Sequence, residues 1–154
     1  MSLDSVRSFL ADAAPDVEIV ELERSSETLT LAAAWGLRPA QIAKTLTLRV
    51  GERTVLLLAT GDSRLDNRKA KETFGGKARM LPAAEAAALT GHPAGGVCPF
   101  GLANPLPVYF DVRLKGYDEV VPAAGSTHAA LRIEPMRMAE LVAAEWVDVC
   151  KDPE

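Results

Sequence analysis

Residues 43–50 of the chain read AKTLTLRV, and after Gly51-Glu52 residues 54–59 read TVLLLA. The first stretch alternates between two kinds of side chain with a period of two, which is the pattern of a strand. Lys44 falls on its apolar face, where it either lays its aliphatic stem on apolar surface or places a cation at the mouth of a pocket. The second stretch is apolar throughout, which is typical of a strand buried on both faces. We therefore predict a hairpin with a tight turn between the two stretches, and we expect the core to begin here.

Further helices and strands are predicted on both sides of this hairpin. Helical periodicity and capping residues mark the helices, and short apolar or alternating runs mark the strands. We expect helices near residues 3–14, 25–37, 66–74, 82–89 and 135–142, and strands near residues 17–22, 108–114, 117–121, 129–133 and 146–150. Because helices and hairpins do not alternate strictly, we predict an α/β fold of the mixed α+β kind. In this fold a mixed sheet curls into a barrel-like shape, and helices surround it.

Length and composition indicate one soluble globular domain that spans residues 1–154. Hydrophobic residues make up 48% of the chain and charged residues 25%, as in ordinary globular proteins. The sequence shows neither a signal peptide nor an apolar stretch long enough for a membrane span, so we expect a cytoplasmic protein with no membrane partner. The two cysteines, Cys98 and Cys150, form neither a disulfide framework nor a zinc-binding pattern. We expect no metal and no cofactor.

The charge of the chain is unevenly distributed. The net charge of −4 at pH 7 argues against a protein that coats nucleic acid by bulk electrostatics. Residues 64–79 differ from the rest, because six basic side chains stand there against two acidic ones, a local charge of +4. Arg68, Lys69 and Lys71 lie on the helix predicted in this segment and are candidates for contacts with phosphate. The alternative is a basic helix face that is only solvated.

A second informative stretch reads TGHPAGGVCPFG at residues 90–101. Four glycines and two prolines occur in these twelve residues, so no helix or strand runs through them. The paired Gly95 and Gly96 adopt backbone angles that other residues disfavour, and such a loop exposes successive N–H groups to a ligand. The alternative is a rigid surface loop without a ligand.

Three motifs occur in a fixed order: IAKTL at residues 42–46, GGVCPFG at residues 95–101 and AGS at residues 124–126. Together they resemble the YbaK/EbsC family of aminoacyl-tRNA deacylases, which is related to the editing domain inserted in bacterial prolyl-tRNA synthetases. The likeness covers nearly the whole chain. It implies a barrel-like mixed sheet wrapped by helices, and a free-standing enzyme that removes the wrong amino acid from tRNA in trans.

The resemblance also implies a substrate and partners. In the family, the lysine that matches Lys44 is required for function and lies near the acceptor end of the substrate. The expected partner is a mischarged aminoacyl-tRNA, in particular tRNA for proline carrying a small non-cognate amino acid, together with a synthetase such as prolyl-tRNA synthetase. Arg68, Lys69 and Lys71 would contact the phosphates of this tRNA. Thr45 stands where relatives carry asparagine, which leaves the identity of the excised amino acid open.

Hydrolysis of an aminoacyl ester needs a held carbonyl group, donors for the oxyanion and a water molecule, but no protein nucleophile. The expected donors are the backbone N–H groups of the loop from Gly95, Gly96 and Val97 to Cys98. Lys44 would orient the ester or stabilise charge, and the ribose hydroxyl of the substrate would assist the water. The expected substrate-binding residues are Thr45, Cys98, Pro99, Phe100, Gly101, Gly125, Ser126 and His128.

Two other functions remain open at this point. Cys98 and His92 lie close in sequence and are candidates for a Cys/His nucleophile pair, although the resemblance favours a requirement for a small residue at position 98 over a reactive thiol. A module that binds tRNA, a nucleotide or a synthetase without hydrolysis would use the same loops. The activities of Lys44 and Cys98 variants on mischarged tRNAs separate the three functions.

Overall fold

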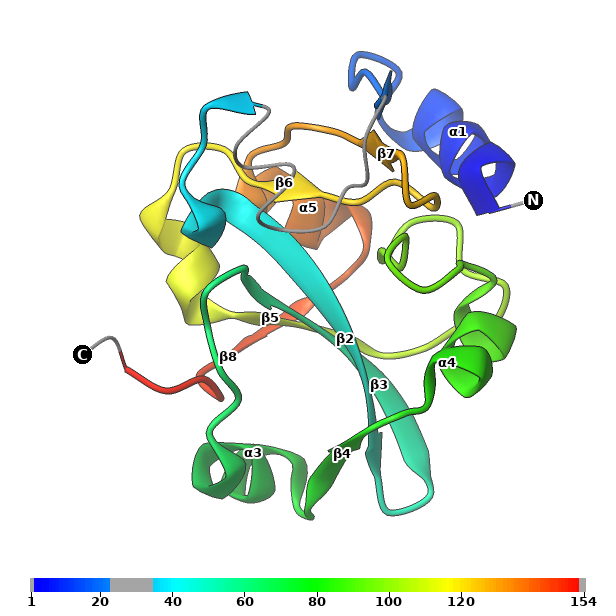
Figure 1. Ribbon diagram of the computed structural model, residues 1–154. Helices are drawn as coiled ribbons and strands as arrows, with labels where there is room; N and C mark the ends of the chain where they lie inside the picture. Colours follow the sequence, from blue (N-terminus) through cyan, green and yellow to red (C-terminus); the bar gives the residue numbers. More distant parts are fainter. Residues whose placement is uncertain (1, 23–34, 153–154) are drawn as a thin grey trace.

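The computed structural model describes residues 2–22 and 35–152 (Figure 1). The helix predicted near residues 25–37 lies largely outside these ranges. The helices are α1 (Ser2–Ala13), α3 (Asn67–Phe74), α4 (Ala83–Thr90) and α5 (Pro135–Leu141), with the 3-10 helices η1 (Pro39–Gln41) and η2 (Val112–Gly116). The strands are β1 (Val20–Glu21), β2 (Ile42–Val50), β3 (Arg53–Thr60), β4 (Ala78–Met80), β5 (Val108–Asp111), β6 (Val121–Pro122), β7 (Ala129–Ala130) and β8 (Glu145–Val147). None of the helices in the described ranges is long and apolar enough to cross a membrane.

The predicted hairpin is the centre of the sheet. β2 and β3 are antiparallel, Lys44 lies opposite Ala59, and the turn contains Gly51 with a φ of 63°. On the other side of β3, β5 pairs in parallel, and β8 pairs in parallel with β5. β4 is antiparallel to one end of β2, and β6 is parallel to its other end. The predicted mixed sheet is therefore confirmed, with the strand order β4-β2-β3-β5-β8.

The barrel-like curl of this sheet stays a prediction. Within the described residues, β4 and β8 end the path of paired strands, and β1 and β7 form a separate two-stranded sheet. An isolated bridge between Ala123 and Ala130 connects the end of β6 to β7. In Figure 1 the long β2–β3 hairpin crosses the middle of the molecule, with the helices arranged around it.

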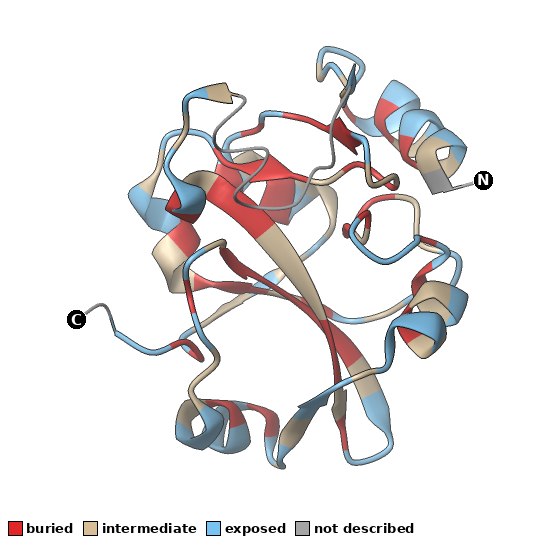
Figure 2. Ribbon diagram, viewed as in Figure 1, coloured by how far each residue is buried: buried red, intermediate tan, exposed pale blue. Residues whose placement is uncertain are grey.

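Side chains of β3 point alternately into two hydrophobic clusters. Buried residues concentrate along this hairpin and in α5 (Figure 2). Leu56 and Leu58 belong to the larger cluster, which we call the main cluster. It includes Val6 and Leu10 of α1, Met138 of α5, and Cys98 and Phe100. Leu57 and Ala59 belong to a smaller cluster with Ala70 and Phe74 of α3, which we call the α3 cluster. Helices therefore cover both faces of the sheet.

The ends of α3 and α4 follow the predicted capping residues. The Asp66 Oδ1 accepts a hydrogen bond from the Lys69 N–H at 3.0 Å, which stabilises the start of α3. Gly75 ends α3 with a φ of 80°, and Gly91 ends α4 with a φ of 79°. Both angles lie in the left-handed region that glycine adopts without strain. The two glycines thus set the directions of the chain into β4 and into the stretch at 91–101.

Several predicted strands are shorter in the structure, and β4 is absent from the prediction. The strand predicted at residues 108–114 ends at Asp111, because its side chain accepts the Arg113 N–H at 3.0 Å and begins η2. The buried Asp111 Oδ2 also accepts the N–H groups of Val149 and Cys150, at 3.0 and 3.1 Å. These bonds compete with strand pairing, so β8 ends at Val147 rather than at Cys150. The strands predicted at 17–22, 117–121 and 129–133 are reduced to β1, β6 and β7.

Candidate functional site

Two loops that are distant in sequence lie against each other: residues 91–101, the glycine loop, and residues 123–128, the serine loop. The N–H of Gly125 donates to the carbonyl of Gly96 at 3.0 Å. A Cβ at position 96 would lie 2.7 Å from backbone atoms of Ser126, so this approach requires glycine. Two of the three motifs that carry the family resemblance therefore form one surface.

The glycine loop is anchored at both ends. The ring of His92, which is 1% exposed, donates through Nε2 to the carbonyl of Phe100 at 2.7 Å. The backbone N–H of His92 donates to the Thr90 Oγ1 at the end of α4, at 3.1 Å. At Gly101, with a φ of 58°, a Cβ would lie 2.5 Å from the carbonyl oxygen of Ser5 in α1. α4 and α1 therefore hold the loop in place from two sides.

The backbone N–H groups of the glycine loop differ in their partners. The N–H of Gly96 donates to the carbonyl of Pro93 at 2.9 Å and closes a turn. The N–H groups of Val97 and Cys98 have no acceptor within residues 2–22 and 35–152. Successive N–H groups of this kind form anion-binding concavities in proteins. The loop therefore leaves two backbone donors without an acceptor among the described residues, at the half-buried Val97 and at the fully buried Cys98. Gly95 contributes a positive φ to this loop, and Gly96 contributes its small size.

Cys98 is not placed to act as a nucleophile. Its side chain is 0% exposed, and burial raises the pKa of the thiol to about 12. The His92 Nε2 lies 3.7 Å from the Cys98 Sγ, but this nitrogen carries the proton that it donates to the Phe100 carbonyl and is no base for the thiol. Pro99 and Phe100 are also buried, and the Phe100 ring lies 5.9 Å from that of Phe9. The side chains of residues 98–100 are therefore part of the core, and contacts of these residues with a substrate stay a prediction.

Lys44 and Thr45 occupy opposite faces of β2. Thr45 lies opposite Leu58 of the main cluster, and its Oγ1 is buried without a partner among the described residues. Lys44 lies opposite Ala59 of the α3 cluster, and its Nζ donates to the carbonyl of Ser63. Burial lowers the pKa of the Lys44 ammonium. Thr45, rather than Lys44, thus lies on the sheet face that packs against the glycine loop.

The serine loop lies near the start of β2. It follows Val121-Pro122 of β6, which pair in parallel with Ile42-Ala43. This pairing brings the loop to the end of β2 that carries Lys44. Within the loop, the Ser126 Oγ accepts the N–H of His128 at 3.1 Å, and the His128 side chain is exposed. The serine loop therefore links the glycine loop to the beginning of β2.

The basic residues of α3 differ in their availability to a ligand. The Lys69 Nζ donates to the Asp148 Oδ1 at 3.1 Å, which ties α3 to the segment after β8. The Arg68 Nε lies 3.4 Å from the Glu72 carboxylate, but both side chains remain largely exposed. Lys71 is exposed and forms no ion pair with another described residue. Of the three residues predicted to contact phosphate, Lys69 is thus already bonded to another part of the protein.

A basic pair on β2 and β4 is missed by the sequence analysis. Arg49 and Arg79 are directly opposite each other in the antiparallel pairing of these strands. Arg49 forms an ion pair with Glu85 of α4 at 2.8 Å, but its Nε is buried without a partner in the described part of the chain. Strand alternation places Arg49 on the face of Thr45. Arg79 is one of the six basic residues of the segment 64–79, but its pairing with Arg49 is not predicted because β4 is too short to be recognised from the sequence.

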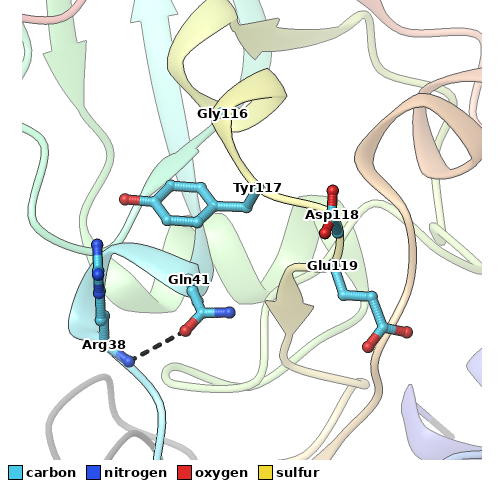
Figure 3. Close-up of a pocket in the computed structure, with 6 residues that line it drawn as sticks. All are labelled: Arg38, Gln41, Gly116, Tyr117, Asp118 and Glu119. Carbon is cyan, nitrogen blue, oxygen red and sulfur yellow. Dashed lines mark hydrogen bonds between the residues drawn. The ribbon is translucent and has the colours of Figure 1, made fainter.

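A separate pocket of about 430 Å³ lies where η1 meets the end of η2 (Figure 3). It is lined by Arg38, Gln41, Gly116, Tyr117, Asp118 and Glu119. The backbone N–H of Arg38 donates to the Gln41 Oε1 at 3.2 Å. No predicted site residue lines the pocket.

Across residues 2–22 and 35–152, no group of three or more His, Cys, Asp or Glu side chains is arranged to hold a metal ion.

Comparisons with known proteins identify relatives along nearly the whole chain. The family model of the aminoacyl-tRNA editing domain matches residues 23–141 of this chain. The chain is also similar to YwhH, an uncharacterised protein of Bacillus subtilis (strain 168). The two are 44% identical over 155 residues, which cover 99% of each chain.

Two further relatives carry functional names. The chain is 30% identical over 139 residues to a proline–tRNA ligase of Desulfovibrio desulfuricans, which covers 88% of this chain and 23% of the ligase. It is 35% identical to the crystal structure of a candidate trans-editing enzyme for prolyl tRNA synthetase, with a TM-score of 0.90 and 98% of both chains covered. The domain match covers more than half of the residues, and the chain belongs to the aminoacyl-tRNA editing domain family.

Proposed function

We propose that the protein is a trans-editing hydrolase that deacylates mischarged aminoacyl-tRNA. Its membership in the editing-domain family supports this role. The relatives named for proline–tRNA ligase and for prolyl tRNA synthetase direct the proposal to tRNA for proline. We infer that the excised amino acid is small and non-cognate, since editing by size exclusion refuses larger side chains sterically, whereas one methylene changes binding by only about 1–3 kcal/mol.

The observation that carries the proposal is that the N–H groups of Val97 and Cys98, beside the contact of the glycine and serine loops, have no acceptor among the described residues. In the proposed reaction, water attacks the carbonyl carbon of the ester, and the carbonyl oxygen becomes an oxyanion that accepts from these N–H groups. The bond to the ribose oxygen then breaks, and that oxygen takes up a proton. The products are the free amino acid and tRNA. Gly95 and Gly96 allow the backbone path that presents the two donors.

We assign binding of the aminoacyl end to residues around the start of β2. Lys44 lies on the other face of β2 from Thr45, and its Nζ donates to the Ser63 carbonyl, so in this proposal it holds the acceptor end where the substrate passes the start of the strand. The Thr45 Oγ1, which is buried without a partner among the described residues, is an acceptor for the amino group of the bound amino acid. Ser126 and His128 approach from the serine loop, and the ribose hydroxyl of the substrate positions the attacking water.

A panel of mischarged tRNAs tests this proposal. We expect the wild type to deacylate at least one of them, Lys44→Ala to be slow, and Cys98→Ser to remain active. If Cys98→Ser is inactive while Lys44→Ala is active, the protein is a cysteine hydrolase. If tRNA binds but no member of the panel is deacylated, the protein is a binding module. Adding prolyl-tRNA synthetase to the same assay measures whether a synthetase partner raises the rate.

A further inference from the structure

We propose that Arg49 and Arg79 form a binding site for a phosphate group in the nucleic-acid part of the substrate. The inference rests on the proposed function, because it places the polynucleotide chain relative to the ester. It concerns a different element from the basic helix α3, since the pair lies across β2 and β4. Three observations support this inference independently, namely the charges of the pair, the hydrogen bonding of Arg49 and the position of the pair on the sheet.

The charges of this pair are not balanced within the described residues. Cβ atoms of directly opposite residues in antiparallel strands are about 5 Å apart, and like charges so placed repel each other. The carboxylate of Glu85 lies 2.8 Å from the Arg49 guanidinium. No carboxylate of residues 2–22 or 35–152 forms an ion pair with the exposed Arg79. Two adjacent cations therefore share one counter-ion, and one positive charge is uncompensated.

Hydrogen bonding of Arg49 is also incomplete. Its Nε is buried and lacks an acceptor within the described residues, although 40% of the side chain remains exposed. A buried donor without an acceptor is unfavourable until a ligand supplies one. Phosphate accepts several N–H groups at once and matches the forked donors of guanidinium groups. A bound phosphate would satisfy this donor and balance the second charge.

The pair lies on the sheet face that carries the proposed ester site. Arg49 shares the face of Thr45, and its ion pair with Glu85 links it to α4, the helix that leads into the glycine loop. The four residues from Thr45 to Arg49 span about 13 Å along the strand. One ester group does not reach over this distance. A ligand that contacts both points is therefore a chain molecule with an anionic group distant from its ester, as at the aminoacylated end of tRNA.

Binding of uncharged tRNA at several salt concentrations tests the site without reference to catalysis. We expect Arg49→Gln and Arg79→Gln each to weaken binding about tenfold. The slope of log K against log salt should decrease by about 0.7–0.9 for each phosphate that the variant no longer neutralises. Lys151→Gln removes one positive charge from the exposed C-terminal segment and should change neither quantity. Glu85→Gln removes the counter-ion of Arg49 and should tighten binding.

Lysine replacements and a minimal substrate sharpen the test. Arg49→Lys and Arg79→Lys keep the charge but lose the forked donors, so their affinities should lie between those of the wild type and the glutamine variants. Hydrolysis of an aminoacyl ester without phosphate should be equal in all of these proteins, whereas KM for aminoacyl-tRNA should rise in the glutamine variants. These readouts separate a phosphate contact from a general loss of folding.

The outcomes distinguish this inference from the proposed function. Unchanged affinity and salt slope in both glutamine variants would refute the phosphate site, even if the wild type deacylates tRNA. If the wild type deacylates nothing but the glutamine variants bind tRNA more weakly, the proposed function fails and the phosphate site stands. An effect of Lys151→Gln as large as that of Arg79→Gln would also refute the site, because net charge alone would then explain the binding.

Discussion

Replacement of Gly96 by alanine tests the contact between the glycine loop and the serine loop. The added Cβ would lie 2.7 Å from the backbone N and C atoms of Ser126, whereas ordinary contact begins at 3.4 Å, so the loops must separate by about 0.7 Å. Because the opposing atoms belong to the backbone, no side-chain rotation relieves the clash. The separation stretches the 3.0 Å bond from the Gly125 N–H to the Gly96 carbonyl. It also moves the N–H groups of Val97 and Cys98.

The expected effect of Gly96→Ala is larger on activity than on stability. A displacement near 1 Å at a reacting centre costs about 100-fold in rate, and overpacking costs about 1–3 kcal/mol in the free energy of unfolding. Single-turnover deacylation of a mischarged tRNA and unfolding in denaturant measure the two effects separately. Gly116→Ala is the matched control, because a Cβ there has no atom within 4 Å, and it should behave as the wild type. A wild-type deacylation rate in Gly96→Ala would refute our placement of the oxyanion donors.

Three further changes test other parts of the structure. Cys98→Ala should deacylate within a few-fold of the wild-type rate, because a fully buried thiol with a pKa of about 12 does not react. A 100-fold loss of rate in single-turnover assays would contradict this expectation. Asp111→Ala should lower the free energy of unfolding by about 3–5 kcal/mol, since it leaves Arg113 and two N–H groups without their buried acceptor. A loss below about 1 kcal/mol in denaturant titrations would show that the bonds to Asp111 are replaceable. The hydrogen bonds from Arg137 hold the pKa of Asp16 at about 2, below its ordinary 3.8, so the pair stabilises the protein above about pH 4 and its contribution is lost as the pH falls towards 2. Asp16→Asn should remove this part of the acid-unfolding curve, and superimposable curves would exclude the effect.

Local sequence signals are sufficient to predict the hairpin and several helix ends. The alternation at residues 43–50 needs no distant partner to indicate a strand, and it places Lys44 and Thr45 on opposite faces, as the structure does. Asp66 and Gly75 act on the backbone of their own helix, so α3 is delimited by residues within or next to it. These features are encoded over a few residues and are therefore predictable from one sequence.

Contacts between distant residues explain the predictions that fail. Asp111 ends β5 early, and two of the N–H groups that its carboxylate accepts lie 38 and 39 residues further along the chain. Lys69 has the sequence context of a solvated or phosphate-binding residue, but its acceptor Asp148 is 79 residues away. β4 has an exposed Arg79 and an exposed Met80, and it is ordered by pairing with β2 rather than by its own apolar pattern. No local pattern contains this information.

The candidate site is predictable as a set of segments but not as a set of atoms. The order of the motifs identifies both loops, and the structure then shows that Gly96 touches Ser126. Which backbone N–H groups lack an acceptor depends on the turn that Gly96 closes with Pro93. Cys98 is buried in the main cluster, which also contains residues of α1 and α5 that are distant in sequence. Orientation and burial within the site therefore require the tertiary structure.

The bonds around Asp111 also constrain how the protein is made. β5 gains its neighbour β8 from residues 145–147, and the buried carboxylate gains two of its donors from residues 149 and 150. While the ribosome is still adding these residues, β5 lacks β8 as its neighbour and the Asp111 carboxylate lacks these two donors. The sheet and the bonds to Asp111 are therefore completed only after residue 150 has left the ribosome.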